Sequence, residues 1–123
     1  MGHIAELQFS RYAREIDLSF QPPIRSSSLL ENVRCFLEEL VKELKTGGCD
    51  FLGHVKIFLE SDNGGGYFFS ITSSEKPPEQ RGHMPETISS AKMTMNAILG
   101  GMPEEALETM VRRSLEKTLI PFR

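Results

Sequence analysis

The stretch GHVKIFLESDNGGGYFFSITSS constrains the fold more than any other part of the chain. Apolar and polar side chains alternate in residues 54–60 and again in residues 67–72, which is the period of a strand with one buried face. The intervening DNGGG supplies the positive backbone angles that a short reversal needs. We therefore predict a β-hairpin whose core-facing residues are Val55, Ile57, Leu59, Tyr67, Phe69 and Ile71.

Two further segments show the same alternation. In REIDLSF, Ile16, Leu18 and Phe20 oppose Glu15, Asp17 and Ser19, and we expect Pro22 and Pro23 to end this strand because proline lacks a backbone donor. In AKMTMNAIL, the core-facing positions are Ala91, Met93, Met95, Ala97 and Leu99. The chain therefore contains four predicted strands.

Helical periodicity appears twice. Residues 28–46 carry apolar side chains at helical spacing, with Ser28 and Glu31 spaced as a capping box, and Gly47 and Gly48 follow. In GGMPEEALETMVRRSLEKTLIPF, Pro103 suits the first helical position, Glu104 and Glu105 lie in the first turn and basic residues in the last, as a helix dipole favours. Both segments are predicted amphipathic helices.

The polar, proline-rich residues 73–87 lack periodicity and predict a long surface loop. The resulting order is strand, helix, three strands, helix. We expect residues 1–123 to form a single α+β domain, a two-layer sandwich whose mostly antiparallel four-stranded sheet carries both helices on one face.

Composition limits the class of protein. A net charge of -3 with both signs dispersed gives no broad basic surface for nucleic acid, so we expect no nucleic-acid partner. The apolar runs are too short to cross a membrane, and the first residues lack a secretory pattern, so we expect a cytoplasmic protein. Two cysteines outside any CxxC pair predict free thiols, with Cys35 buried and Cys49 exposed.

The second face of the predicted sheet is polar, and three interpretations of it remain open. It is a solvated surface, a homodimer interface that shields Phe58 and Phe68, or a ligand site beneath the 73–87 loop. The candidate ligand-binding or interface residues are His54, Lys56, Thr72, Lys92 and Asn96. The whole face is expected to consist of Glu15, Asp17, Ser19, His54, Lys56, Phe58, Ser70, Thr72, Lys92, Thr94 and Asn96.

Known catalytic motifs are missing from the sequence. It contains no GxxxxGK[ST] phosphate loop, no GxSxG elbow and no HxH, HExxH or CxxC metal spacing, so we expect neither a cofactor nor a metal. An alternative hypothesis is a small enzyme in which Asp17 orients His54 as a general base. In that case Lys56 or Lys92 would bind an anionic substrate.

The segments LGHVKIFLESDNGGGYFFSITSS and AKMTMNAILGGMPEEALETMV resemble the module that follows the GTPase domain in some CobW-type proteins, a group related to cobalamin synthesis and metal chaperones. The resemblance covers roughly the second half of the chain. It consists of Gly53, His54 and Lys56 on a strand, a glycine hairpin, and Asn-Ala-Ile before a helix.

Members of that family hydrolyse GTP through a phosphate loop and carry a cysteine-containing metal motif, and this chain has neither. The resemblance therefore implies a non-catalytic accessory domain linked to metal or cobalamin metabolism. Its implied partner is a separate P-loop GTPase, and the homodimer interpretation of the polar face adds a second copy of the chain as an expected partner.

Overall fold

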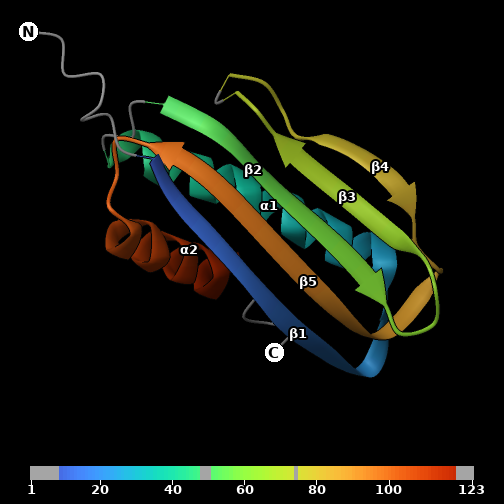
Figure 1. Cartoon of the computed structure of the whole chain (residues 1–123). Coiled ribbons are helices and arrows are strands. Elements are labelled where there is room, and N and C mark those ends of the chain that lie inside the picture. The colour runs from blue at the N-terminus through green and yellow to red at the C-terminus, as the bar shows by residue number, and fades with distance from the viewer. Residues whose placement is uncertain (1–8, 48–50, 74, 119–123) are drawn as a thin grey trace, which may run out of the picture.

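The computed structural model describes residues 9–47, 51–73 and 75–118, which form one antiparallel sheet and two helices (Figure 1). The chain is of the α+β class, as predicted. The elements in chain order are β1 (Phe9–Arg25), α1 (Ser26–Thr46), β2 (Phe51–Ser61), β3 (Gly66–Ile71), β4 (Glu79–His83), β5 (Thr87–Gly100) and α2 (Glu104–Thr118).

The strands lie in the order β1-β5-β2-β3-β4, and every neighbouring pair is antiparallel. The predicted hairpin is confirmed, because β2 pairs with β3 in a register that joins Leu59 to Tyr67. Gly64 and Gly65 in its turn have φ values of 98° and 91°, which explains the glycines there. β2 therefore lies at the centre of the sheet, between β5 and β3.

The prediction of four strands is wrong, because β4 lies within the predicted 73–87 loop and pairs with β3. All five residues of β4 are exposed, so no apolar alternation marks it in the sequence. Gly82 has a φ of 128°, and a Cβ there would overlap the carbonyl oxygen of Gly66. The strand can approach β3 this closely because the residue is glycine.

The prediction that Pro22 and Pro23 end the first strand is also wrong. β1 continues to Arg25, with an irregular register between Ser19 and Ile24. Because β1 is an edge strand, one of its sides has no strand neighbour. A proline without an N–H group is tolerated there.

The predicted capping box does not start α1, which begins at Ser26, two residues before Ser28. The N-cap residue, Arg25, makes no side-chain cap hydrogen bond. The Ser26 backbone N–H instead donates to the carbonyl oxygen of Glu86 at 2.9 Å. A contact with the segment before β5 replaces the local cap. The expected end is confirmed at Gly47, whereas Gly48 lies outside the described residues.

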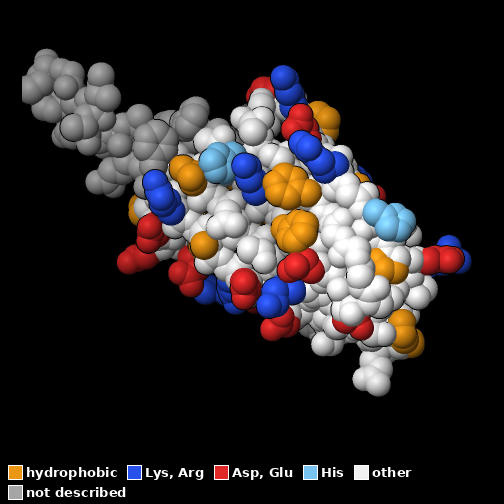
Figure 2. Space-filling view, turned by 45° about the vertical axis from the view of Figure 1, so that its right-hand side comes forward, with side chains coloured by type: hydrophobic (Ala, Val, Ile, Leu, Met, Phe, Trp, Pro, Cys, Tyr) orange, Lys and Arg blue, Asp and Glu red, His pale blue; other side chains and the backbone are white. Residues whose placement is uncertain are grey.

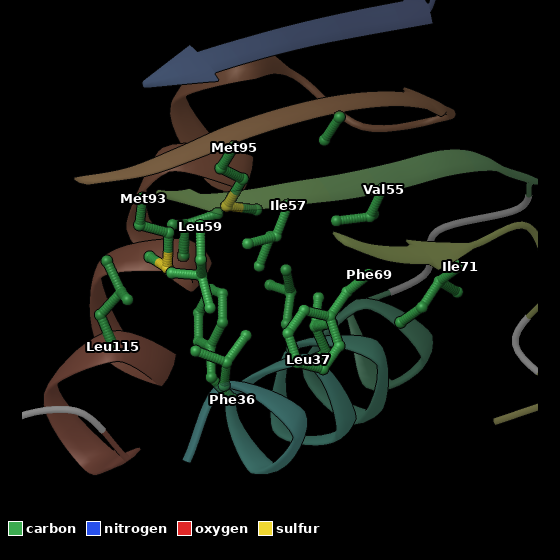
Figure 3. Packing of buried hydrophobic residues seen from close by; sticks show 14 of the residues in the cluster. Phe36, Leu37, Val55, Ile57, Leu59, Phe69, Ile71, Met93, Met95 and Leu115 are labelled. Atoms are coloured by element: carbon green, nitrogen blue, oxygen red, sulfur yellow. The ribbon is translucent and has the colours of Figure 1, made fainter. Parts of the chain in front are cut away.

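Both helices pack against the same face of the sheet (Figures 1 and 3). Apolar side chains of α1 recur every three or four residues and form one stripe, and α2 presents a shorter stripe beside it. Burying one such side chain contributes roughly 1.5–3 kcal/mol. The helical contribution to the core consists of Leu29, Val33, Phe36, Leu37, Leu40, Leu44, Leu107, Val111 and Leu115.

The sheet contributes the positions that its alternation predicted, including Val55, Ile57 and Phe69, each 0% exposed. Cys35 is half-buried rather than buried, because it lies at the edge of the apolar stripe of α1, and Cys49 is outside the described residues. Neither helix in the described part of the chain combines the length and the apolar character needed to cross a membrane.

Candidate functional site

The side of the sheet that faces away from the helices is called the open face. Every described side chain on it is exposed or half-buried. The pairing registers place the side chains of five strands in rows across it. Its residues are Arg11, Ala13, Glu15, Asp17 and Ser19 of β1, Lys92, Thr94, Asn96 and Ile98 of β5, His54, Lys56, Phe58 and Glu60 of β2, Phe68 and Ser70 of β3, and Glu79, Arg81 and His83 of β4.

Two phenylalanines occupy the centre of the open face. Phe58 lies on the central strand and is 39% exposed, and its register partner on β3 is the half-buried Phe68. Figure 2 shows two adjacent hydrophobic side chains near the middle of this surface, with basic side chains above them and an acidic one directly below. Partly exposed aromatic side chains surrounded by charges are typical of an interaction surface.

A shallow depression of about 550 Å³ surrounds the pair. Phe58 and Phe68 form its apolar part, and Lys56, Ser70 and Arg81 contribute polar groups. This volume lies within the range of small-molecule sites, which are apolar with a few placed polar groups. The depression can therefore accommodate a small ligand or the projecting side chains of a protein partner.

On β1 and β2, the charges of the open face are separated by sign along the strand, whereas Glu79 of β4 lies in the row of Lys56. Lys56 lies one row from Phe58 toward one end of β2, and His54 and Arg11 follow in the next row. These three residues are called the basic end. Glu60 lies one row from Phe58 in the other direction, in a row with Asp17, and Asp62 follows β2. These three are called the acidic end, which also contains Lys92.

Ion pairs are concentrated on the helical side of the molecule. Arg34 pairs with Glu31 and Glu38 along α1, and Lys117 of α2 pairs with Glu39 at 3.4 Å. Among the residues that the structure describes, no ion pair involves a side chain of the open face. The charges of the open face are therefore available to a binding partner.

The structure places four of the five predicted interface residues on this side of the sheet, though not in one cluster, and the fifth, Thr72, just beyond the end of β3. Lys56 is the register partner of Asn96, His54 lies in the next row, and Thr72 directly follows β3. Lys92 is the register partner of Glu60, which lies four residues from Lys56 along β2. Lys92 and Lys56 are therefore separated by about 14 Å along the strand direction. His54, Lys56 and Asn96 thus lie in two neighbouring rows, and Lys92 lies in the row of Glu60.

The residues of the alternative catalytic hypothesis are far apart. The register partner of Asp17 on β5 is Lys92, and that of His54 is Ile98. These two positions are six residues apart, so Asp17 and His54 are separated by about 20 Å along the strand direction. Asp17 therefore cannot orient His54 in this fold. A hollow of about 390 Å³ beneath residues 76–78 is lined mainly by α1, and His54 does not line it.

Sequence reasoning missed Glu79 and Arg81, which line the depression from β4. The sequence predicts a loop there because the side chains of this strand are all polar or glycine. The feature of the sequence that could have indicated β4 is the apolar character of β3. An apolar strand at the edge of a sheet is usually paired with another strand or covered by another segment.

Within residues 9–47, 51–73 and 75–118, no group of three or more His, Cys, Asp or Glu side chains is placed to hold a metal ion. Comparison with protein-family models, with curated proteins and with solved structures found no match to this chain.

Proposed function

We propose that this protein is a non-catalytic interaction domain whose open face binds a partner or a small ligand. The observation that carries the proposal is the pair of exposed Phe58 and half-buried Phe68 amid charges that form no ion pair with other described residues. A face that served only as a solvated surface would have less reason to keep an aromatic pair at its centre. A partner that covered Phe58 would gain a favourable free energy of roughly 25 cal/mol for each Å² of apolar surface buried.

The contrast between the two sides of the molecule supports this proposal. On the helical side, charged residues such as Arg34 and Lys117 are paired within the chain. On the open face, Lys56 and Glu60 have uncharged or like-signed neighbours along their strand and are separated by Phe58. Unpaired charges around an apolar centre supply orientation and specificity to an interface.

The resemblance to the accessory module of CobW-type proteins motivates the biological context. We propose a role beside a separate P-loop GTPase in metal or cobalamin metabolism. Gly53, His54 and Lys56, the residues that carry the resemblance, lie on β2, the central strand of the sheet. The same strand carries Phe58, so the residues of the resemblance and the proposed binding surface are neighbours.

Native mass spectrometry of the purified full chain tests this function. We expect wild-type protein to retain a second mass, either a protein subunit or a small molecule. Phe58→Ser should lose that mass because it removes the centre of the open face. Lys42→Ser, which removes a side chain from the solvent side of α1, should retain it.

Circular dichroism establishes that both variants are folded before the spectra are compared. The proposal fails if wild-type protein carries no second mass, or if both variants retain it equally. A protein that co-purifies with both variants counts as non-specific.

A further inference from the structure

We infer that the partner of the open face is a second copy of this chain, docked face to face and inverted along the strands. This inference rests on the proposed function and specifies the partner of the same surface. Its basis is the central position of Phe58 together with the opposite charges on either side of it.

Phe58 lies at the centre of the face in both directions. β2 is the middle strand of five, and the row of Phe58 is the middle one of the three rows that cross all five strands. A two-fold axis through this row, parallel to the face and perpendicular to the strands, places Phe58 opposite its own copy. Phe68 then also meets its own copy, and four aromatic rings form one apolar centre.

The same axis exchanges the two ends of the face. The row of Lys56 lies above the row of Glu60 in the partner copy, so two Lys56–Glu60 pairs flank the phenylalanines. One row further, His54 lies near the turn of the partner copy that carries Asp62, whose Oδ1 accepts a hydrogen bond from the Ser90 N–H at 3.3 Å. The basic end of each copy therefore covers the acidic end of the other, which is the self-complementarity that a two-fold interface requires.

A second face-to-face dimer is possible, with its two-fold axis parallel to the strands. Its electrostatic interactions at the centre of the interface are less favourable. It would bring Lys56 onto its own copy and Glu60 onto its own copy, beside the apolar centre where water is excluded. In the inverted arrangement, like charges meet only at Glu15 and Arg81, on the edge strands β1 and β4. Solvent and salt weaken repulsion at such edges.

The open face has the size that such a contact needs. Strands about 4.8 Å apart and rows about 6.8 Å apart give it a projected area of roughly 650 Å². Each partner of a standard interface buries roughly 800 Å² of accessible surface, and projecting side chains raise the accessible area above the projected one. Two sheets can pack about 10 Å apart with nearly aligned strands.

Charge reversal tests this geometry in the full-length protein. Sedimentation equilibrium should show a wild-type dimer. Lys56→Glu places two acids opposite each other, and Glu60→Lys places two bases opposite each other. Each variant alone should raise the dimer dissociation constant at least about tenfold. Lys42→Glu, the same charge change on α1, should leave the constant unchanged.

The decisive sample is an equal mixture of the two single variants, one of them labelled with ¹⁵N. Positions 56 and 60 are both acidic in the Lys56→Glu chain and both basic in the Glu60→Lys chain. Every acid beside the apolar centre would then face a base of the other chain, so a heterodimer should form with near wild-type affinity. Native mass spectrometry identifies it by its mass. Phe58→Ser is a further variant that should weaken the dimer without altering any charge.

Single variants that dimerise as well as wild type would overturn the inverted arrangement, and so would a mixture that yields no heterodimer. A wild-type chain that stays monomeric would overturn the choice of partner. In that case, a small molecule or a different protein lost on Phe58→Ser would still support the proposed function.

Discussion

The two sides of this molecule use the same kinds of charged residue differently. On the helical side, Arg34 and Lys117 each contact carboxylates of the same chain, and Arg113 pairs with Glu43 at 3.7 Å. On the open face, the charged residues of β1 and β2 are ordered by sign along each strand, and no described side chain of this face forms an ion pair. A side of the molecule whose charges are satisfied internally needs no partner, whereas an ordered, unsatisfied one is suited to recognition.

The same difference appears along a single strand. Met93 and Met95 of β5 are 0% exposed, whereas Lys92 and Asn96 on either side of them are exposed. Successive side chains of a strand point to opposite faces, so the strand contributes equally to the core and to the open face. Substitutions at neighbouring positions of β5 therefore affect different properties. One position alters the packing of the core, and the next alters the open face.

The largest expected effect comes from two neighbouring phenylalanines of β3. Phe69→Ala should destabilise the fold by about 3–5 kcal/mol, because Phe69 is fully buried and its removal leaves a cavity. Phe68→Ala, one position away on the open face, should cost about 1 kcal/mol or less. Urea unfolding at a protein concentration at which the wild type is monomeric measures both, so that loss of the proposed dimer does not add to the cost of Phe68→Ala.

This comparison would be broken if Phe68→Ala proved as costly as Phe69→Ala. Phe68 would then be a structural residue, and the open face would lose half of its aromatic centre. Equal far-ultraviolet circular dichroism of the two variants at low denaturant is the control for residual structure.

A smaller effect is expected from the glycine that allows β4 to join the sheet. Gly82→Ala should destabilise the protein by about 2–3 kcal/mol, because φ is positive and the new Cβ would overlap backbone atoms of β3. Gly64→Ala is the matched control, since its φ is 98° but no atom lies within 4 Å of the added Cβ. It should cost about 1 kcal/mol. Thermal unfolding of both variants separates steric overlap from backbone strain.

A substitution of Ser114, on the buried side, is expected to stabilise the fold, unlike the preceding substitutions. Its hydroxyl is buried in α2, and among the described residues it has no hydrogen-bond partner. Ser114→Ala should therefore stabilise the fold by about 1 kcal/mol, because it removes an unsatisfied polar group and improves helix propensity. A lower unfolding temperature for this variant would show that the hydroxyl is satisfied in solution.

The smallest expected effect concerns the charges of α1. The hydrogen bond from Arg34 holds the pKa of the Glu31 carboxyl below its usual range. The resulting stabilisation is complete above the unfolded pKa and is lost as the pH falls through the folded one. Arg34→Gln should raise the pKa of Glu31, as measured by NMR titration of the side-chain carboxyl. An unchanged pKa would mean that this pair is not formed in solution.

Much of the fold could be predicted because its elements carry regular periods. The hairpin, the stripe of α1 and the alternation of β5 all follow from apolar spacing. β4 could not be found in this way, because its stability depends on backbone bonding to β3 rather than on buried side chains. The start of α1 was misplaced for a similar reason, since Ser26 is held by a residue that is distant in the sequence, Glu86.

The open face was predictable in composition but not in arrangement. Alternation assigns Lys56 and Lys92 to one side of the sheet, yet it does not say that β5 lies between β1 and β2. Only the strand order and register reveal that Asp17 is distant from His54 and that Phe58 is central. Pairwise proximity across strands is a tertiary property that local periodicity does not encode.

The position of β5 also determines the order in which the protein can assemble. β1 and β2 are sequential strands in the chain but do not touch in the sheet, because β5, the last of the described strands in the sequence, lies between them. During translation, β2, β3 and β4 can pair locally, whereas β1 has no strand partner until residues 87–100 emerge. The sheet should therefore close only after β5 has emerged, and slowly, because its closure depends on contacts distant in sequence.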